Sequence, residues 1–127
     1  MRATFQELPL LVEAGPSQVR GGDWGGMRIQ VASVPAGTDF TPLLAGLPGD
    51  RCPCDHWGYV VKGRLRVQHA DGTEEIVQAG DYYHMPQGHT AVAEEDTEFL
   101  EVGDPTPHQQ FVENATKIVA GMESATS

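Results

Sequence analysis

The stretch from residue 56 to residue 104 is divided into short runs by turn-forming residues at regular intervals. Turns are expected at Lys62-Gly63, Ala70-Asp71-Gly72, Ala79-Gly80 and Pro86-Gln87-Gly88, and the chain as a whole has 15 Gly and 9 Pro. With a further turn at Asp96, these turns separate six runs: HWGYVV, RLRVQH, EEIVQ, DYYHM, TAVAEE and TEFLEV. Many short strands with turn residues between them are typical of an antiparallel sandwich or a closed barrel. The sequence therefore predicts an all-β fold.

The segments before this stretch are less regular. MRIQVASV (27–34) alternates apolar and polar residues and predicts a strand, and a further strand is expected near residues 8–12. AGPSQVRGGDWGG (14–26) is rich in glycine and predicts a loop. Residues 35–50 contain three prolines and predict an irregular crossing.

The C-terminal part has a different periodicity. Apolar residues at positions 111, 112, 115, 118, 119 and 122 follow helical spacing, so we expect a helix over about 107–122 that packs on the outside of the barrel. The 127 residues suit one domain, with a barrel core over about 27–104.

Charge and hydropathy exclude several classes of partner. The net charge is −10, from 18 acidic and 8 basic residues, which disfavours binding to nucleic acid or to anionic membranes. No apolar run has the length of a membrane span. The first fifteen residues contain Glu7 and lack the apolar core of a signal peptide. We therefore expect a cytoplasmic protein whose cysteines are thiols or metal ligands and not a disulfide.

The two cysteines of the chain lie beside a histidine in RCPCDHWG (51–58). In an extended strand Cys52, Cys54 and His56 point to the same face, where thiolate and imidazole groups can bind one divalent metal ion. Zinc suits this ligand set best, and iron or nickel also fits. The alternative is a pair of buried thiols beside a surface histidine, because free cysteine is often a core residue.

A second group of histidines lies in GDYYHMPQGHT (80–90). His89 follows a Pro-x-Gly turn and is the fourth candidate ligand, while His84 is an alternative whose face the sequence leaves open. His69 and His108 are expected to be solvated. The acids of the last strand region are expected to form a charged face: Glu94, Glu95, Asp96, Glu98 and Glu101.

From Gly46 to about Glu95 the chain resembles the cupin superfamily, whose members are small jelly-roll barrels of the double-stranded β-helix type. The family's second motif, G-x5-P-x-G-x2-H-x3-N, is matched by Gly80, Pro86 and Gly88. In its first motif, G-x5-H-x-H-x3-4-E-x6-G, the frame of Gly46 places Cys52 and Cys54 at the histidine pair.

The chain departs from both motifs at the residues that hold a metal in the family. Counted back from Gly63, the family's glutamate falls on His56, which leaves one residue between it and Cys54. In the second motif the family's histidine falls on Ala91 and its asparagine on Glu95, with His89 two positions early.

The resemblance implies a fold and a class of function. Cupins generally bind a divalent metal inside the barrel, and many are dimers. We expect a small metal-binding cupin with Cys52, Cys54, His56 and His89 as ligands, which forms a homodimer and acts as a metalloenzyme on a small organic molecule. The alternative is a non-catalytic ligand-binding or sensory cupin, with a structural metal or with none.

Overall fold

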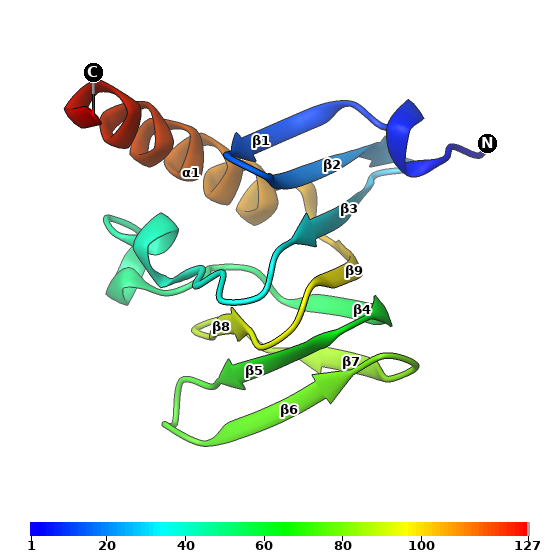
Figure 1. The fold of residues 1–127 in the computed structure, drawn as a ribbon. Helices are drawn as coiled ribbons and strands as arrows, with labels where there is room; N and C mark the ends of the chain where they lie inside the picture. Colours follow the sequence, from blue (N-terminus) through cyan, green and yellow to red (C-terminus); the bar gives the residue numbers. More distant parts are fainter. Residues whose placement is uncertain (127) are drawn as a thin grey trace.

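In the computed structural model, which describes residues 1–126, two antiparallel sheets face each other and a long helix lies against one of them (Figure 1). The strands of the larger sheet, in spatial order, are β1 (Leu10–Ala14), β2 (Ser17–Trp24), β3 (Met27–Val34), β9 (Thr97–Gly103), β4 (His56–Lys62) and β7 (Tyr82–Met85). Those of the smaller sheet are β6 (Glu74–Gln78), β5 (Arg64–Gln68) and β8 (Thr90–Ala93). The six strands predicted after residue 55 and the strand at 27–34 are confirmed.

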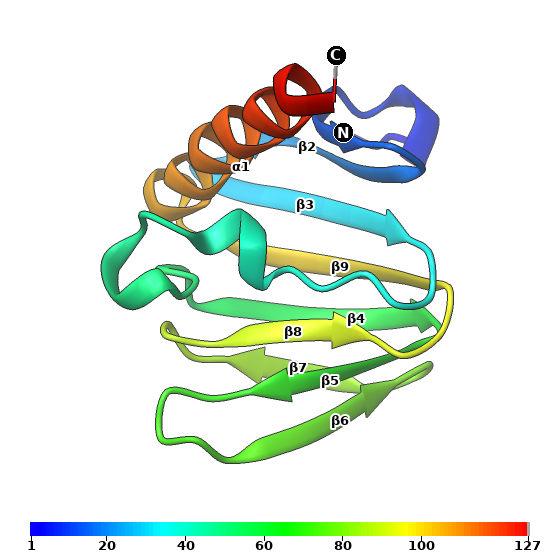
Figure 2. The same cartoon turned by 60° about the vertical axis from the view of Figure 1, so that its left-hand side comes forward.

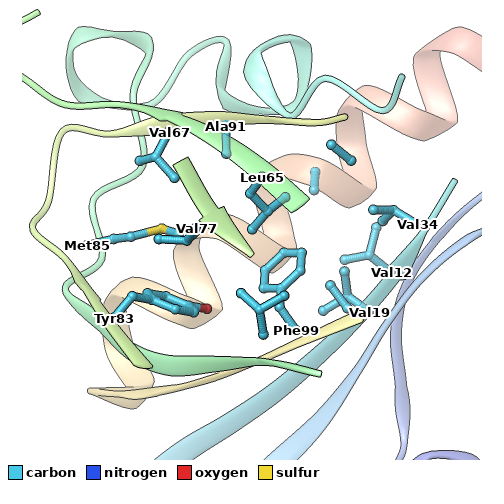
Figure 3. Packing of buried hydrophobic residues seen from close by; sticks show 14 of the residues in the cluster. Val12, Val19, Val34, Leu65, Val67, Val77, Tyr83, Met85, Ala91 and Phe99 are labelled. Atoms are coloured by element: carbon cyan, nitrogen blue, oxygen red, sulfur yellow. The ribbon is translucent and has the colours of Figure 1, made fainter. Parts of the chain in front are cut away.

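The core lies between the two sheets. Inward side chains alternate with outward ones along the strands, as in β9, where every second residue from Thr97 to Gly103 is buried. Figure 3 shows Phe99 of β9, Leu65 of β5 and Val19 of β2 pointing into the same interior. This apolar interior continues into the cavity described below.

The predicted loop over residues 14–26 is wrong for most of its length, because Ser17–Trp24 form strand β2. Here the inward positions Val19 and Gly21 alternate with more exposed neighbours, but glycine gives no hydrophobic signal in the sequence. Gly21 is needed for space, since a Cβ atom there would lie 2.1 Å from the carbonyl oxygen of Ile29 on β3. Glycine at this position therefore indicates that two strands approach closely, and it does not indicate a loop.

The irregular crossing predicted over residues 35–50 is present and contains two short 3-10 helices, η2 (Thr41–Leu44) and η3 (Pro48–Asp50); a third, η1 (Phe5–Glu7), precedes β1. Figure 2 shows this crossing passing beside the open side of the two sheets. Its segment 41–44 packs against the C-terminal helix. Leu44, only 2% exposed, contributes to the wall around the cysteines.

The C-terminal helix α1 (Pro105–Thr126) extends beyond the predicted span at both ends. Asp104 caps it, because its carboxylate accepts a hydrogen bond of 2.8 Å from the Thr106 amide. The helix buries Val112, Ala115 and Val119 and packs against β1 and η2. Its first turn reaches the end of β9, which brings His108 into the interior. Among the described residues, no helix combines the length and apolar character needed to span a membrane.

Candidate metal centre

Cys52 and Cys54 lie just before β4 and are both buried, at 6% and 0% exposure. The residues before His56 are not part of a regular strand, so the alternation of side chains along a strand does not explain how Cys52 and Cys54 are placed. The side chains nevertheless meet, because the two sulfur atoms and a ring nitrogen of His56 all lie within 4.8 Å of one another. The three predicted ligands therefore surround one point.

Backbone hydrogen bonds join this segment to the loop that carries His89. The Cys52 amide donates to the His89 carbonyl at 3.0 Å, and the Gly88 amide donates to the Cys52 carbonyl at 2.7 Å. A positive φ of 92° at Gly88 lets the chain turn back here. The turn places the side chain of His89 beside Cys52.

The two histidines beside the thiols have fixed ring orientations. In His89 the Nδ1 atom donates to the Pro86 carbonyl at 2.7 Å, which leaves Nε2 with its lone pair. In His56 the Nε2 atom lies 3.3 Å from Cys52 Sγ, and Nδ1 lies 2.9 Å from Glu101 Oε2. The two rings are 4.9 Å apart between centroids.

His84 does not join this group. It lies on the outer face of β7 with a side chain that is 44% exposed, and its ring stacks on Trp57 at 4.8 Å. Between the two histidines of this region, the structure places His89 inside, beside Cys52 and His56, and His84 outside the barrel. His89 is not among the ligand atoms of Cys52, Cys54 and His56 that lie within 4.8 Å of one another.

The charges of the centre are strongly coupled. The hydrogen bond from Cys54, together with the contacts of His56 and His89, holds the pKa of the Cys52 thiol far below its usual range despite burial. The same Cys52 contact and burial raise the pKa of Cys54. The pair therefore holds one thiolate and one thiol at neutral pH.

His56 carries the opposite charge. Burial alone would lower its pKa, but the Glu101 carboxylate and the Cys52 thiolate outweigh this effect and raise the pKa of His56 to about 10. A buried imidazolium thus lies between a buried carboxylate and a buried thiolate.

Two residues that sequence reasoning placed elsewhere belong to this centre. Glu101 is only 8% exposed and pairs with His56, so its assignment to a charged outer face is wrong. His108 was expected to be solvated and is fully buried, with Nε2 2.9 Å from His56 Nδ1. The parity of Glu101 with Phe99 along β9 is a signal that could have indicated an inward carboxylate. His69 was also expected to be solvated; it lies half-buried near the surface, 3.2 Å from Glu75.

Tyr83 holds Glu101 from the opposite side. Its hydroxyl lies 3.1 Å from the Leu100 carbonyl and 3.3 Å from Glu101 Oε1. Gly58 makes room for the ring, since a Cβ atom there would lie 2.6 Å from the Tyr83 hydroxyl oxygen. Burial, reinforced by the Glu101 charge, raises the pKa of Tyr83, which stays a neutral hydrogen-bond donor.

A cavity of about 50 Å³ adjoins the centre. Its lining includes Cys52, His56, His89 and Glu101 and is otherwise largely apolar, with Phe40, Leu44, Phe99 and Phe111 among the residues. Space of this size holds a few water molecules or a small part of an organic molecule. A largely apolar lining with a few polar groups is the usual form of a small-molecule site.

Comparisons with known proteins agree with this architecture. Residues 53–103 match the family model described as "Cupin domain". An RmlC-like cupin from Shewanella frigidimarina superposes with a TM-score of 0.59 at 16% identity, over 81% of this chain and 88% of that one. No curated protein sequence matches the chain significantly.

Two further solved structures share the fold. The polyketide cyclase RemF from Streptomyces resistomycificus superposes with a TM-score of 0.59 at 18% identity, over 82% of this chain and 78% of that one. KdgF from Halomonas sp. superposes with a TM-score of 0.58 at 22% identity, over 82% of this chain and 94% of that one. With the two facing sheets, these likenesses show that the chain has a cupin-type fold, within which residues 53–103 match the model of the cupin domain.

Proposed function

We propose that this cupin binds a divalent metal ion, zinc in the first place, through Cys52, Cys54, His56 and His89. The observation that carries the proposal is the orientation of the two imidazoles. Each has its Nδ1 atom at a hydrogen-bond acceptor, Glu101 or the Pro86 carbonyl, which leaves Nε2 for an ion; His56 Nε2 lies 3.3 Å from Cys52 Sγ. Metal-binding histidines in proteins usually have this arrangement, because the outer partner fixes the ring and its tautomer.

The donor set favours zinc over harder ions. Two sulfur and two nitrogen donors in a buried site are a common tetrahedral zinc shell. The 3.3 Å between Cys52 Sγ and His56 Nε2 corresponds to an angle of about 100° at an ion placed at usual zinc distances. Iron and nickel accept the same donors and remain the next candidates.

The cavity beside the centre supports a small-molecule ligand. Three of the four proposed metal ligands line it, while its walls are apolar. A compact organic molecule with an apolar body and one polar end fits these surroundings. Four protein ligands complete a tetrahedral shell, so the site favours ligand binding next to a structural ion over turnover.

Catalysis by the metal is the second candidate. It requires one position held by water or substrate, and the raised pKa of Cys54 makes that thiol the ligand most easily replaced. X-ray absorption of the loaded protein would separate the candidates, because a shell with two sulfurs supports the structural role and one with a single sulfur and an added oxygen supports the catalytic one.

The first test is elemental analysis of protein purified without a polyhistidine tag. Wild type and the control His84→Gln are expected to retain about one zinc, iron or nickel ion per chain. Cys52→Ser/Cys54→Ser and His89→Gln are expected to bind it at least about tenfold more weakly. Wild type that stays metal-free after reconstitution would exclude the proposal.

We also propose a homodimer. Trp57 and Tyr82, 53% and 85% exposed on the outer face of β4 and β7, support an apolar interface there. Light scattering coupled to gel filtration tests it, with Tyr82→Lys expected to shift the protein toward a monomer.

A further inference from the structure

The ring of His56 has a second group of ligand atoms on the side away from the cysteines. His56 Nδ1, a Glu101 carboxylate oxygen and His108 Nε2 lie within 4.8 Å of one another. Nδ1 is 2.9 Å from Glu101 Oε2 and 2.9 Å from His108 Nε2. All three side chains are buried, at 5%, 8% and 0% exposure.

In the group formed by His56, Glu101 and His108, hydrogen-bond acceptor atoms outnumber the N–H groups that can donate to them. His108 Nδ1 donates to the Asp104 carbonyl at 2.7 Å, so its Nε2 atom carries a lone pair. Glu101 Oε2 is a second acceptor. One N–H, on His56 Nδ1, serves both of them. A buried acceptor without a full partner is costly, and a cation would satisfy all three atoms at once.

We propose that His56, Glu101 and His108 form a second cation site, for a divalent ion of the Fe²⁺ or Mn²⁺ type that prefers nitrogen and oxygen ligands. Two imidazoles and one carboxylate with open positions suit such ions. Donor atoms 2.9 Å apart subtend about 90° at an ion some 2.1 Å from each, which is the angle of a six-coordinate shell. Two of the three residues, His56 and Glu101, also line the cavity.

The local packing is arranged around these side chains. A Cβ atom at Gly103 would lie 2.6 Å from His108 Cε1 and 2.6 Å from the Asp55 carbonyl, so only glycine leaves room for the His108 ring. On the other side, Tyr83 occupies Glu101 Oε1 and leaves Oε2 to face the two imidazoles. Groups from β4, β7, β9 and α1 thus fix the three donor atoms.

The second site shares His56 with the thiolate centre. With a cation on Nδ1, the Nε2 atom carries the proton and donates to the Cys52 thiolate at the observed 3.3 Å. The charges of the ion, the Glu101 carboxylate and the Cys52 thiolate then sum to zero. An ion at either centre therefore competes for one imidazole, but the second site needs no cysteine and stands independently of the zinc proposal.

Manganese is the probe that separates the two sites, because Mn²⁺ binds thiolates weakly. Metal-free protein is titrated with Mn²⁺, and free ion is followed by its electron paramagnetic resonance signal. Wild type, Cys52→Ser/Cys54→Ser and the control His84→Gln are expected to bind one ion each. His108→Gln and Glu101→Gln are expected to bind it at least about tenfold more weakly, with folding checked by circular dichroism.

Several results would overturn the second site. These are no Mn²⁺ binding by wild type at millimolar ion, unchanged binding in both His108→Gln and Glu101→Gln, or loss of binding in the double serine variant. Where one of the two ligand variants does not fold, the other decides. Loss of zinc from the serine variant concerns only the thiolate centre, so the two proposals fail separately.

Discussion

The inner and outer faces of β4, β7 and β9 carry the same kinds of side chain in different surroundings. Inside, His56 and Tyr83 are buried around Glu101. Outside, one residue away along the same strands, Tyr82 is exposed and His84 stacks on Trp57. The inner imidazole is held as a cation by two buried anions, while the outer one has a mixed aromatic and solvent environment. Burial and pairing, and not residue type, make the chemistry of this sheet.

The largest difference between the faces is expected for the two histidines. His56→Ala leaves the Glu101 carboxylate and the Cys52 thiolate buried without a cation, so the free energy of unfolding should fall by about 3–5 kcal/mol. His84→Ala should change it by less than about 0.5 kcal/mol. Urea denaturation of the metal-free proteins measures both changes in unfolding free energy. Equal changes for His56→Ala and His84→Ala would contradict the difference between the inner and outer faces.

The cost of removing His56 should depend on pH in a defined direction. Its pKa is about 10 in the folded protein, above the value of about 6.5 expected when unfolded. The folded state therefore binds this proton more tightly, and the stabilisation is complete below pH 6.5 and is lost as pH rises through 10. The difference in unfolding free energy between wild type and His56→Ala should shrink from pH 6 to pH 10.5. A difference in unfolding free energy that stays constant over this pH range would contradict a charged His56 paired with Glu101.

A smaller effect is expected where the inner face has no spare room. Gly103→Ala places a methyl group 2.6 Å from His108 Cε1 and the Asp55 carbonyl, and should cost about 1–3 kcal/mol. Gly22→Ala is the matched control, since β2 has open space there and an ordinary φ. The melting temperature measured by thermal unfolding should fall in Gly103→Ala and stay unchanged in Gly22→Ala.

The smallest effect separates the two adjacent tyrosines. Tyr83→Phe removes a buried hydroxyl beside the Leu100 carbonyl and Glu101, and should cost about 1 kcal/mol. Tyr82→Phe, on the exposed side of the same strand, should be neutral within error. A reversed order in urea midpoints would show that the hydroxyl of Tyr83 contributes nothing.

The sequence predicts the strands after residue 55 well, because their turns are local. Gly63, Gly72, Gly80 and Gly88 all have positive φ, so each turn depends on a residue type that can be recognised without knowing the fold. Strand β2 (Ser17–Trp24) was missed because the role of its glycine is not local. Its Gly21 is needed for close packing of two strands, and that need arises only when β3 lies beside it.

Some residues of the candidate site could likewise be predicted from the sequence, and others could not. Cys52, Cys54 and His56 could be proposed together because they are neighbours in the chain. Glu101 and His108 could not, since one becomes a partner through the register that sets it opposite Gly58 and the other through the position of a helix end. Tertiary packing buries both residues, although they look solvated in the sequence.

The backbone hydrogen bonds between Cys52 and the loop at His89 have a consequence for the rate at which the proposed metal ion would exchange. They close a long stretch of chain as part of folding, so the entropy of bringing these donors together is lost before any ion arrives. An entering ion does not have to organise the chain, and a leaving ion does not release it. Exchange is then limited by opening of the barrel. Removal by a chelator should proceed at a rate that does not change with chelator concentration.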